Sequence, residues 1–129
     1  MIDHVSVAVR DIVAAARFYD VLLATIGVVR LETRPTTVGF GKKYPEFWIN
    51  LREMTISNGT HICFRARTID MVNAFHAAAI AAGGTSDGVP GLRPQHGEGY
   101  YAAFIRDPDG NRIEAVTFVE VEPQARRCY

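Results

Sequence analysis

An internal repeat with a period of 57 residues constrains the fold of this chain more than any other feature of its sequence. When the sequence is shifted by that period, HVSVAVRDIVAAARFY from His4 lies over HICFRARTIDMVNAFH from His61. Three further identities follow the same shift: Arg10 with Arg67, Phe18 with Phe75, and Gly27 with Gly84. The hydropathy patterns of the two segments also match, so we expect two copies of one structural unit that pack against each other.

Each copy opens with the pattern of a strand and continues with the pattern of a helix. In residues 2–9 and again in residues 61–66, large apolar side chains alternate with polar or small ones. This alternation predicts strands with one face toward a core. Apolar residues then follow at helical spacing between a capping residue and a glycine. The expected helix boundaries are Asp11 and Gly27 in the first copy, and Thr68 or Asp70 and Gly83-Gly84 in the second.

Short strand-like runs follow each helix, at residues 28–32, 37–41 and 46–52 in the first half. In the second half the glycine- and proline-rich segment 84–99 delays the matching strands. We expect these strands at residues 100–106 and 112–119, on either side of the turn DPDGN. The predicted fold class is α+β, with two tandem βαβββ modules that form a curved mixed sheet around a metal cleft. The expected divisions are one domain at 1–119, made of modules 1–57 and 58–119, and a tail at 120–129.

Charge and cysteine content exclude several classes of function. Lys plus Arg and Asp plus Glu both number 14, so neither nucleic acid nor an anionic membrane surface is an expected partner. The longest apolar runs fall far short of the ~20 residues that a membrane span requires, and no signal peptide is evident. We therefore expect a cytoplasmic protein in which Cys63 and Cys128 are plain thiols.

His4 and His61 occupy equivalent positions at the start of their strands. The valine face of the first strand and the Ile62 and Phe64 face of the later one must pack against helices, which leaves both histidines on the opposite face. A single histidine on a strand is usually an ordinary polar residue. Two equivalent histidines on one surface favour a shared functional site.

The last hairpin supplies an acidic residue to the same face. A turn at residues 107–111 pairs Phe104 with Glu114 and Ile105 with Ile113, so Glu114 lies opposite the helix-facing core. Its apolar neighbours make an unpaired carboxylate costly, and a metal ion or a cationic partner removes that cost. The alternative is a glutamate at a solvated mouth, paired with an arginine such as Arg65 or Arg52.

Two imidazoles and one carboxylate form a ligand set for a divalent ion with open coordination positions, such as Fe, Mn, Ni or Zn. The predicted metal ligands are therefore His4, His61 and Glu114. When FWINL is aligned with NRIEA, Asn50 falls on Glu114 and offers at best a weak fourth ligand. The remaining position is then left to water or to a substrate that places oxygens on the metal.

The leading strand HVSVAVRD, the mid-chain GTHICFRA and the ending YYAAFIRDPDGNRIEAV resemble the vicinal-oxygen-chelate superfamily over residues 1–119. This superfamily includes glyoxalase I, fosfomycin-resistance thiol transferases, extradiol dioxygenases and bleomycin-resistance proteins. The resemblance implies two modules around a metal cleft, with ligands at the positions of His4, His61 and Glu114. It also implies a homodimer in which modules can pair between chains.

The resemblance leaves several functions open. The first is lyase or isomerase chemistry on a small substrate that chelates the metal through vicinal oxygens. The second is an Fe(II) dioxygenase of extradiol type, although the chain is short for one. The third is a metal-free protein that sequesters a drug or another small molecule. Glyoxalase I has a carboxylate on the fourth strand where this chain offers Asn50, and the potassium loop of the fosfomycin-resistance enzymes is not seen.

Further residues receive roles around the expected cleft. Glu114, His96 and Tyr100 are the catalytic candidates, because His96 lies in the loop over the cleft as a possible general acid or base and Tyr100 shares a face with Glu114. Arg93 could hold a substrate carboxylate. The other substrate-binding candidates are Trp48, Asn50 and Phe104.

Overall fold

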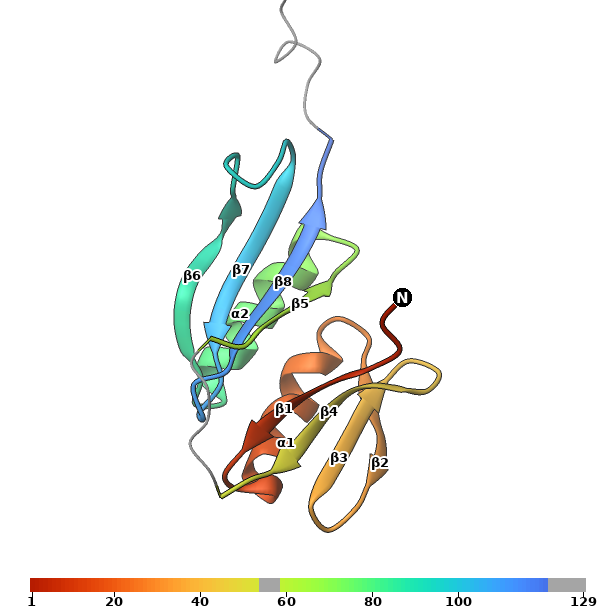
Figure 1. Cartoon of the computed structure of the whole chain (residues 1–129). Helices are drawn as coiled ribbons and strands as arrows, with labels where there is room; N and C mark the ends of the chain where they lie inside the picture. The colour runs from red at the N-terminus through yellow and green to blue at the C-terminus, as the bar shows by residue number, and fades with distance from the viewer. Residues whose placement is uncertain (54–58, 121–129) are drawn as a thin grey trace, which may run out of the picture.

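The computed structural model describes residues 1–53 and 59–120, which form two modules of the same architecture (Figure 1). The elements of module 1 are β1 (Val5–Val9), α1 (Ile12–Ala24), β2 (Val29–Thr33), β3 (Thr37–Gly41) and β4 (Pro45–Leu51). Those of module 2 are β5 (His61–Arg65), α2 (Ile69–Ala81), β6 (Thr85–Leu92), β7 (Tyr100–Arg106) and β8 (Arg112–Phe118). The expected module boundary at residue 57, the tail beyond Glu120 and Cys128 lie outside the described residues.

Each module forms one four-stranded mixed sheet. The strand orders are β1-β4-β3-β2 and β5-β8-β7-β6, so the two sheets are topologically equivalent. The first strand of each module is parallel to the last one, and the other pairs are antiparallel. In Figure 1 the sheets lie side by side, with β1 and β5 as their facing edges and a helix behind each sheet. The α+β fold of two tandem βαβββ modules is therefore confirmed.

The helices begin where the capping residues predict, but the first ends at Ala24, three residues before the expected Gly27. The carboxylate of Asp11 accepts a hydrogen bond from the backbone N–H of Ala14 at 3.0 Å. In the second module Thr68, rather than Asp70, is the N-cap, and its hydroxyl accepts from the N–H of Met71 at 3.1 Å. Gly27, at φ +78°, follows the first helix in a conformation that favours glycine. Neither helix in the described part of the chain is long and apolar enough to cross a membrane.

The expectation that segment 84–99 only delays the strands is wrong, because β6 occupies residues 85–92. This strand pairs with β7 through two register shifts, between Ser86 and Gly88 and between Gly88 and Gly91. Glycine and proline mask the alternating pattern that identifies a strand. They are tolerated here because β6 is at the edge of the sheet, where bulges are common and a missing N–H costs no ladder bond.

One hydrophobic core runs through both modules. The Phe47 ring of module 1 and the Phe64 ring of module 2 contact each other edge to face, with centroids 5.1 Å apart. Aromatic pairs in this geometry add about 0.5–1.5 kcal/mol beyond the area they bury. The largest fully buried apolar residues are Tyr19, Phe40, Phe47, Phe75, Leu22, Leu23, Ile49, Ile105 and Ile113.

The DPDGN turn of module 2 is anchored in module 1 by a buried carboxylate. Asp107 is 3% exposed, and its Oδ2 accepts a hydrogen bond of 2.6 Å from the hydroxyl of Tyr19 on α1. The same oxygen accepts 2.8 Å from the side-chain amide of Asn111, which also donates 2.8 Å to the carbonyl of Ala8 on β1. Oδ1 accepts from the backbone N–H groups of Asp109 and Asn111. The turn is therefore a contact between modules as well as a chain reversal.

Replacement of Tyr19 by phenylalanine should lower the free energy of unfolding near pH 7. The substitution keeps the ring in the core and removes only the donor to Asp107. A hydrogen bond to a charged group contributes about 1.5–3 kcal/mol, and chemical denaturation should show a loss of that size. Tyr44→Phe is the matched control, because Tyr44 is 50% exposed. Equal stability of wild type and Tyr19→Phe would contradict the anchoring role.

The stabilisation from Tyr19 should also depend on pH. Burial, and then the Asp107 carboxylate, raise the pKa of Tyr19 well above its ordinary value of 10.0. The unfolded chain ionises near pH 10 and the folded chain does not, so the stabilisation is complete below pH 10 and is lost as the pH rises further. The stability difference between wild type and Tyr19→Phe should therefore shrink above pH 10. A difference that stays constant up to pH 11 would contradict this explanation.

Candidate metal site

The open face of module 2, on the side of its sheet away from α2, carries the polar residues that the strand pattern placed there. The predicted hairpin register is confirmed, since Phe104 pairs with Glu114, Ile105 with Ile113, and Arg106 with Arg112. His61 and Cys63 on β5 share this face with Glu114, because Cys63 pairs with Glu114 across the parallel ladder.

Glu114 is the centre of this face. Its side chain is 2% exposed, and Oε1 lies 2.8 Å from Nε2 of His61, which is 47% exposed. The Tyr100 hydroxyl donates a hydrogen bond to Oε2. The alternative pairing of Glu114 with Arg65 or Arg52 is wrong, because no ion pair in the described residues joins it to an arginine.

Burial and the nearby Glu114 carboxylate keep the Tyr100 hydroxyl and the Cys63 thiol protonated. Desolvation, and then the hydrogen bond to Glu114, raise the pKa of the Tyr100 hydroxyl above its ordinary value. Desolvation, followed by the charge of Glu114, raises the pKa of the Cys63 thiol to about 12. Tyr100 therefore acts as a donor to the carboxylate at neutral pH, and Cys63 is not an activated nucleophile.

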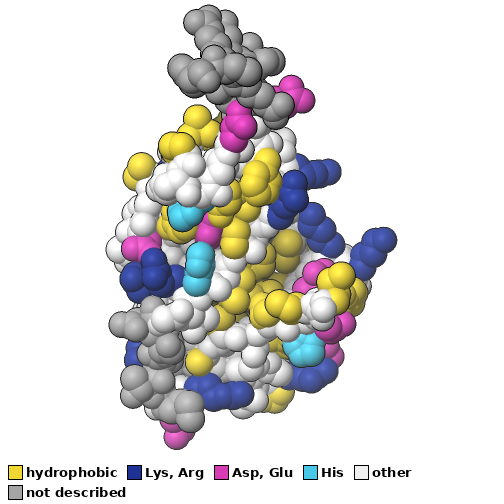
Figure 2. All heavy atoms as spheres, turned by 45° about the horizontal axis from the view of Figure 1, so that its top comes forward, with side chains coloured by type: hydrophobic (Ala, Val, Ile, Leu, Met, Phe, Trp, Pro, Cys, Tyr) yellow, Lys and Arg dark blue, Asp and Glu magenta, His cyan; other side chains and the backbone are white. Residues whose placement is uncertain are grey.

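Aromatic rings border the His61–Glu114 pair. The centroids of the His61 and Phe104 rings are 6.3 Å apart, and those of His96 and Tyr100 are 5.3 Å apart. The Arg93 guanidinium lies over Phe104, at 5.5 Å from the ring centroid. Figure 2 shows histidine and acidic side chains gathered beside a strip of hydrophobic side chains on one face of the molecule. Five predicted site residues of module 2 are thus close to Glu114.

His4 lies on module 1, away from this pair. Its Nδ1 is 2.8 Å from the carboxylate of Asp3, and its side chain is 58% exposed. It borders a cavity of about 410 Å³ on the open face of module 1, together with Ser6, Trp48 and Asn50. Trp48 and Asn50 thus line the same cavity as His4. The structure does not bring His4 into contact with His61 or Glu114 of the same chain.

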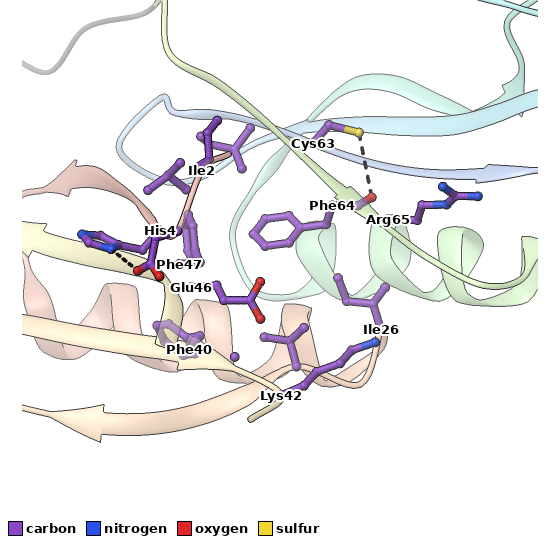
Figure 3. Close-up of a pocket in the computed structure, with 15 residues that line it drawn as sticks. Ile2, His4, Ile26, Phe40, Lys42, Glu46, Phe47, Cys63, Phe64 and Arg65 are labelled. Atoms are coloured by element: carbon purple, nitrogen blue, oxygen red, sulfur yellow. Dashed lines mark hydrogen bonds and ion pairs between the residues drawn. The ribbon is translucent and has the colours of Figure 1, made fainter. Parts of the chain in front are cut away.

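A second cavity, of about 420 Å³, lies between the modules. In Figure 3, His4 and Cys63 lie on opposite sides of it, with Phe47 and Phe64 between them. The two aromatic side chains belong to the shared core.

The expected equivalence of Asn50 with Glu114 is wrong by two residues. Ser6, two residues after His4, pairs with Trp48, and Cys63, two residues after His61, pairs with Glu114. Trp48 therefore occupies the position of Glu114 in module 1. A shift of two residues keeps every side chain on the same face, so the alternation could not reveal it. The amide of Asn50 instead accepts a hydrogen bond of 2.5 Å from the Thr37 hydroxyl.

Two arginine–aromatic pairs at the edges of the open faces were not expected from the sequence. Arg34 lies 5.3 Å from the centre of the Trp48 ring, and Arg65 lies 4.8 Å from that of Phe118. The signal for the second pair was present in the alternation, because Arg65 and Phe118 follow His61 and Glu114 at even spacing. The first pair joins Arg34, which follows β2, to Trp48 on β4, and it has no local signal.

The residues of one chain fit part of a divalent metal site. One imidazole nitrogen beside one buried carboxylate is a donor set that zinc and first-row transition metals accept. Within residues 1–53 and 59–120, however, no three histidine, cysteine or acidic side chains lie close enough together to hold an ion. A complete site requires at least one more ligand than the described residues of one chain bring together.

Comparisons with known proteins agree with this architecture. A glyoxalase/bleomycin resistance protein from Albidiferax ferrireducens T118 is 36% identical, has a TM-score of 0.80, and is matched over 88% of this chain and 96% of its own. A glyoxalase/bleomycin resistance protein/dioxygenase family enzyme from Burkholderia phytofirmans PsJN is 23% identical, with a TM-score of 0.74 and coverage of 92% and 98%. The fosfomycin resistance protein FosX from Mesorhizobium loti is 16% identical, with a TM-score of 0.66 and 90% coverage of each chain. The last two share the fold.

The comparison with curated proteins gave no match. The family comparison is decisive, because the model of one family matches residues 1–115, which include both modules and all three candidate ligands. The chain belongs to the Glyoxalase/Bleomycin resistance protein/Dioxygenase superfamily.

Proposed function

We propose that this protein is a metal-dependent enzyme whose small substrate binds the metal through two neighbouring oxygen atoms. The reaction class that we favour is lyase or isomerase chemistry. His61 and Glu114 of one chain and His4 of a second copy would hold the divalent ion. The protein would then act as a homodimer with two equivalent sites.

One observation carries the proposal. The Glu114 carboxylate is almost completely buried, and its partners are an imidazole and a phenol rather than a cation of fixed charge. Burial of an ionised carboxylate is costly, and a metal ion offsets that cost. His61 remains half exposed beside it, which leaves room for an ion and a substrate on the open face.

The third ligand is assigned to a partner because of the position of His4. This histidine is on the open face of module 1, which has the same topology as the face that carries His61 and Glu114. Two chains related by a two-fold axis could place the module 1 face of each opposite the module 2 face of the other. Each of the two sites would then contain both histidines and the glutamate.

The remaining residues receive roles from their contacts. The Tyr100 hydroxyl holds Oε2 of Glu114 and so fixes the direction of Oε1. His96 is exposed beside the Tyr100 ring and would exchange a proton with a bound substrate. In a dimer, Trp48 and Asn50 would face the substrate from the other side. Phe104 provides the apolar surface next to His61.

The bound ion would polarise the substrate oxygens as a Lewis acid and stabilise an anion that forms on them. Its identity distinguishes the functions within the superfamily. Iron would favour the dioxygenase alternative, and manganese, nickel or zinc would favour the lyase or isomerase reaction.

Elemental analysis of protein purified without chelators or a metal-affinity tag tests the metal site. We expect about one ion per chain in the wild type, and a loss of nearly all of it in His61→Ala and Glu114→Ala, because each variant lacks one of three ligands. His76→Ala and Glu53→Ala are the matched controls and should keep the ion. His76 bonds Ser86, outside the His61–Glu114 cluster, and Glu53 is exposed beyond β4.

The opposite result is equally specific. A wild type that holds no divalent ion, even after reconstitution, would contradict metal-dependent catalysis. Sequestration of a small molecule without a metal would then be the better account of this protein's function.

Tyr100→Phe should weaken metal binding without removing a ligand. Loss of a partner that orients a ligand typically costs 10–100-fold in metal affinity. Competition with a chromophoric chelator gives the dissociation constant for zinc. Tyr101→Phe is the matched control, because that hydroxyl bonds Asn73 on α2, on the other side of the sheet. Equal affinities of the two variants would show that the Tyr100 hydroxyl does not position Glu114.

A further inference from the structure

We propose that Arg93 is the binding site for a carboxylate of the substrate, and that the substrate is a planar acid with its metal-binding oxygens at the end away from that carboxylate. The inference rests on the proposed function for the site of the oxygens. The site for the carboxylate rests on separate contacts on β6 and β7.

The Arg93 guanidinium is held in one place on the open face of module 2. Nη2 donates to the carbonyl of Val89 at 2.5 Å, and Nη1 donates to that of Leu92 at 3.5 Å. The Phe104 ring lies beneath the guanidinium plane. Two carbonyl contacts and one ring contact restrict an arginine side chain that would otherwise be free to rotate, so little entropy remains to be lost when a ligand binds.

The bulges of β6 make room for this guanidinium. A Cβ atom at Gly88 would lie 3.2 Å from Nη2, and one at Gly91 would lie 3.1 Å from Nη1. Both distances are shorter than ordinary van der Waals contacts, so a Cβ at either position would shift the end of the arginine side chain by a few tenths of an ångström. Gly88 and Gly91, which obscured this strand in the sequence, therefore leave room for the Arg93 side chain.

The charge of Arg93 is not neutralised by a carboxylate within residues 1–53 and 59–120. The neighbouring Arg106 and Arg112 both pair with Asp87. A guanidinium has five N–H donors, and the two carbonyls use only two of them. The free donors fit the two oxygens of a carboxylate, which arginine binds bidentately.

Phe104 lies between this cation and the His61–Glu114 pair. It is directly opposite Glu114 in the ladder, and its ring is near both the guanidinium and the His61 imidazole. A planar substrate could extend from Arg93 to the His61–Glu114 pair, with its carboxylate toward Arg93 and its two oxygens toward His61 and Glu114. An aromatic ring with a carboxylate opposite two neighbouring hydroxyls has this arrangement.

The test compares 3,4-dihydroxybenzoate with 3,4-dihydroxybenzamide, which has the same shape and no charge. Calorimetric titration without oxygen gives both affinities, for zinc-loaded protein and for protein in EDTA. In each state we expect the wild type to bind the acid at least tenfold more tightly than the amide, equivalent to about 1.4 kcal/mol. In Arg93→Gln this preference should fall below threefold, while the affinity for the amide changes little.

Two further variants separate a placed guanidinium from general charge. Arg67→Gln removes the same charge from an exposed position outside the open face and should keep the full preference. Gly91→Ala keeps every charge, but its Cβ would meet Nη1 of Arg93 and no other atom within 4 Å. It should shift the guanidinium by a few tenths of an ångström and give a preference between those of the wild type and Arg93→Gln.

The outcomes are distinguishable from those of the proposed function. A protein that binds no metal but keeps the Arg93-dependent preference in EDTA would contradict the metal enzyme and support the carboxylate site. Three results would overturn the carboxylate site. The preference for the acid could survive in Arg93→Gln, or this variant could lose affinity equally for the acid and the amide. The third such result is that the wild type binds the acid in neither state.

Discussion

A buried carboxylate at the turn between β7 and β8 holds the two modules together, and the geometry of both open faces depends on it. Asp107 accepts hydrogen bonds from Tyr19 on α1 and from Asn111, which in turn reaches the backbone of β1. Because the same turn sets the register of the last hairpin, it also decides which face carries Glu114. The DPDGN segment therefore determines two things at once: the position of module 1 relative to module 2, and the direction of the central carboxylate.

The two modules share a topology and differ in what they present on their open faces. Module 2 brings together a buried carboxylate, a half-exposed imidazole and a phenol that stays protonated. Module 1 presents His4, and the position of Glu114 is taken by Trp48. Under the proposed function each chain would hold part of a site. A second copy would supply the missing ligand, since a two-fold axis would complete both sites together.

Much of the fold could be predicted from the sequence, because alternation, capping residues and the DPDGN turn are local signals. They gave the modules, the helix starts and the pairing of Phe104 with Glu114. Strand β6 was missed because its bulges and its Gly and Pro residues break the alternation. The equivalence of Trp48 with Glu114 was missed because a shift of two residues preserves the face. The inter-module bond between Tyr19 and Asp107, 88 residues apart, has no local signal at all.

Mixed dimers test most directly whether the site is shared between chains. His4→Ala and Glu114→Ala proteins with different tags would be co-expressed, and the heterodimer isolated and analysed for metal. We expect both variant homodimers to be nearly empty and the heterodimer to hold about half an ion per chain, because one of its two sites regains all three ligands. An empty heterodimer, or a His4→Ala homodimer that keeps its metal, would contradict a site built from His4 of one chain and His61 and Glu114 of the other.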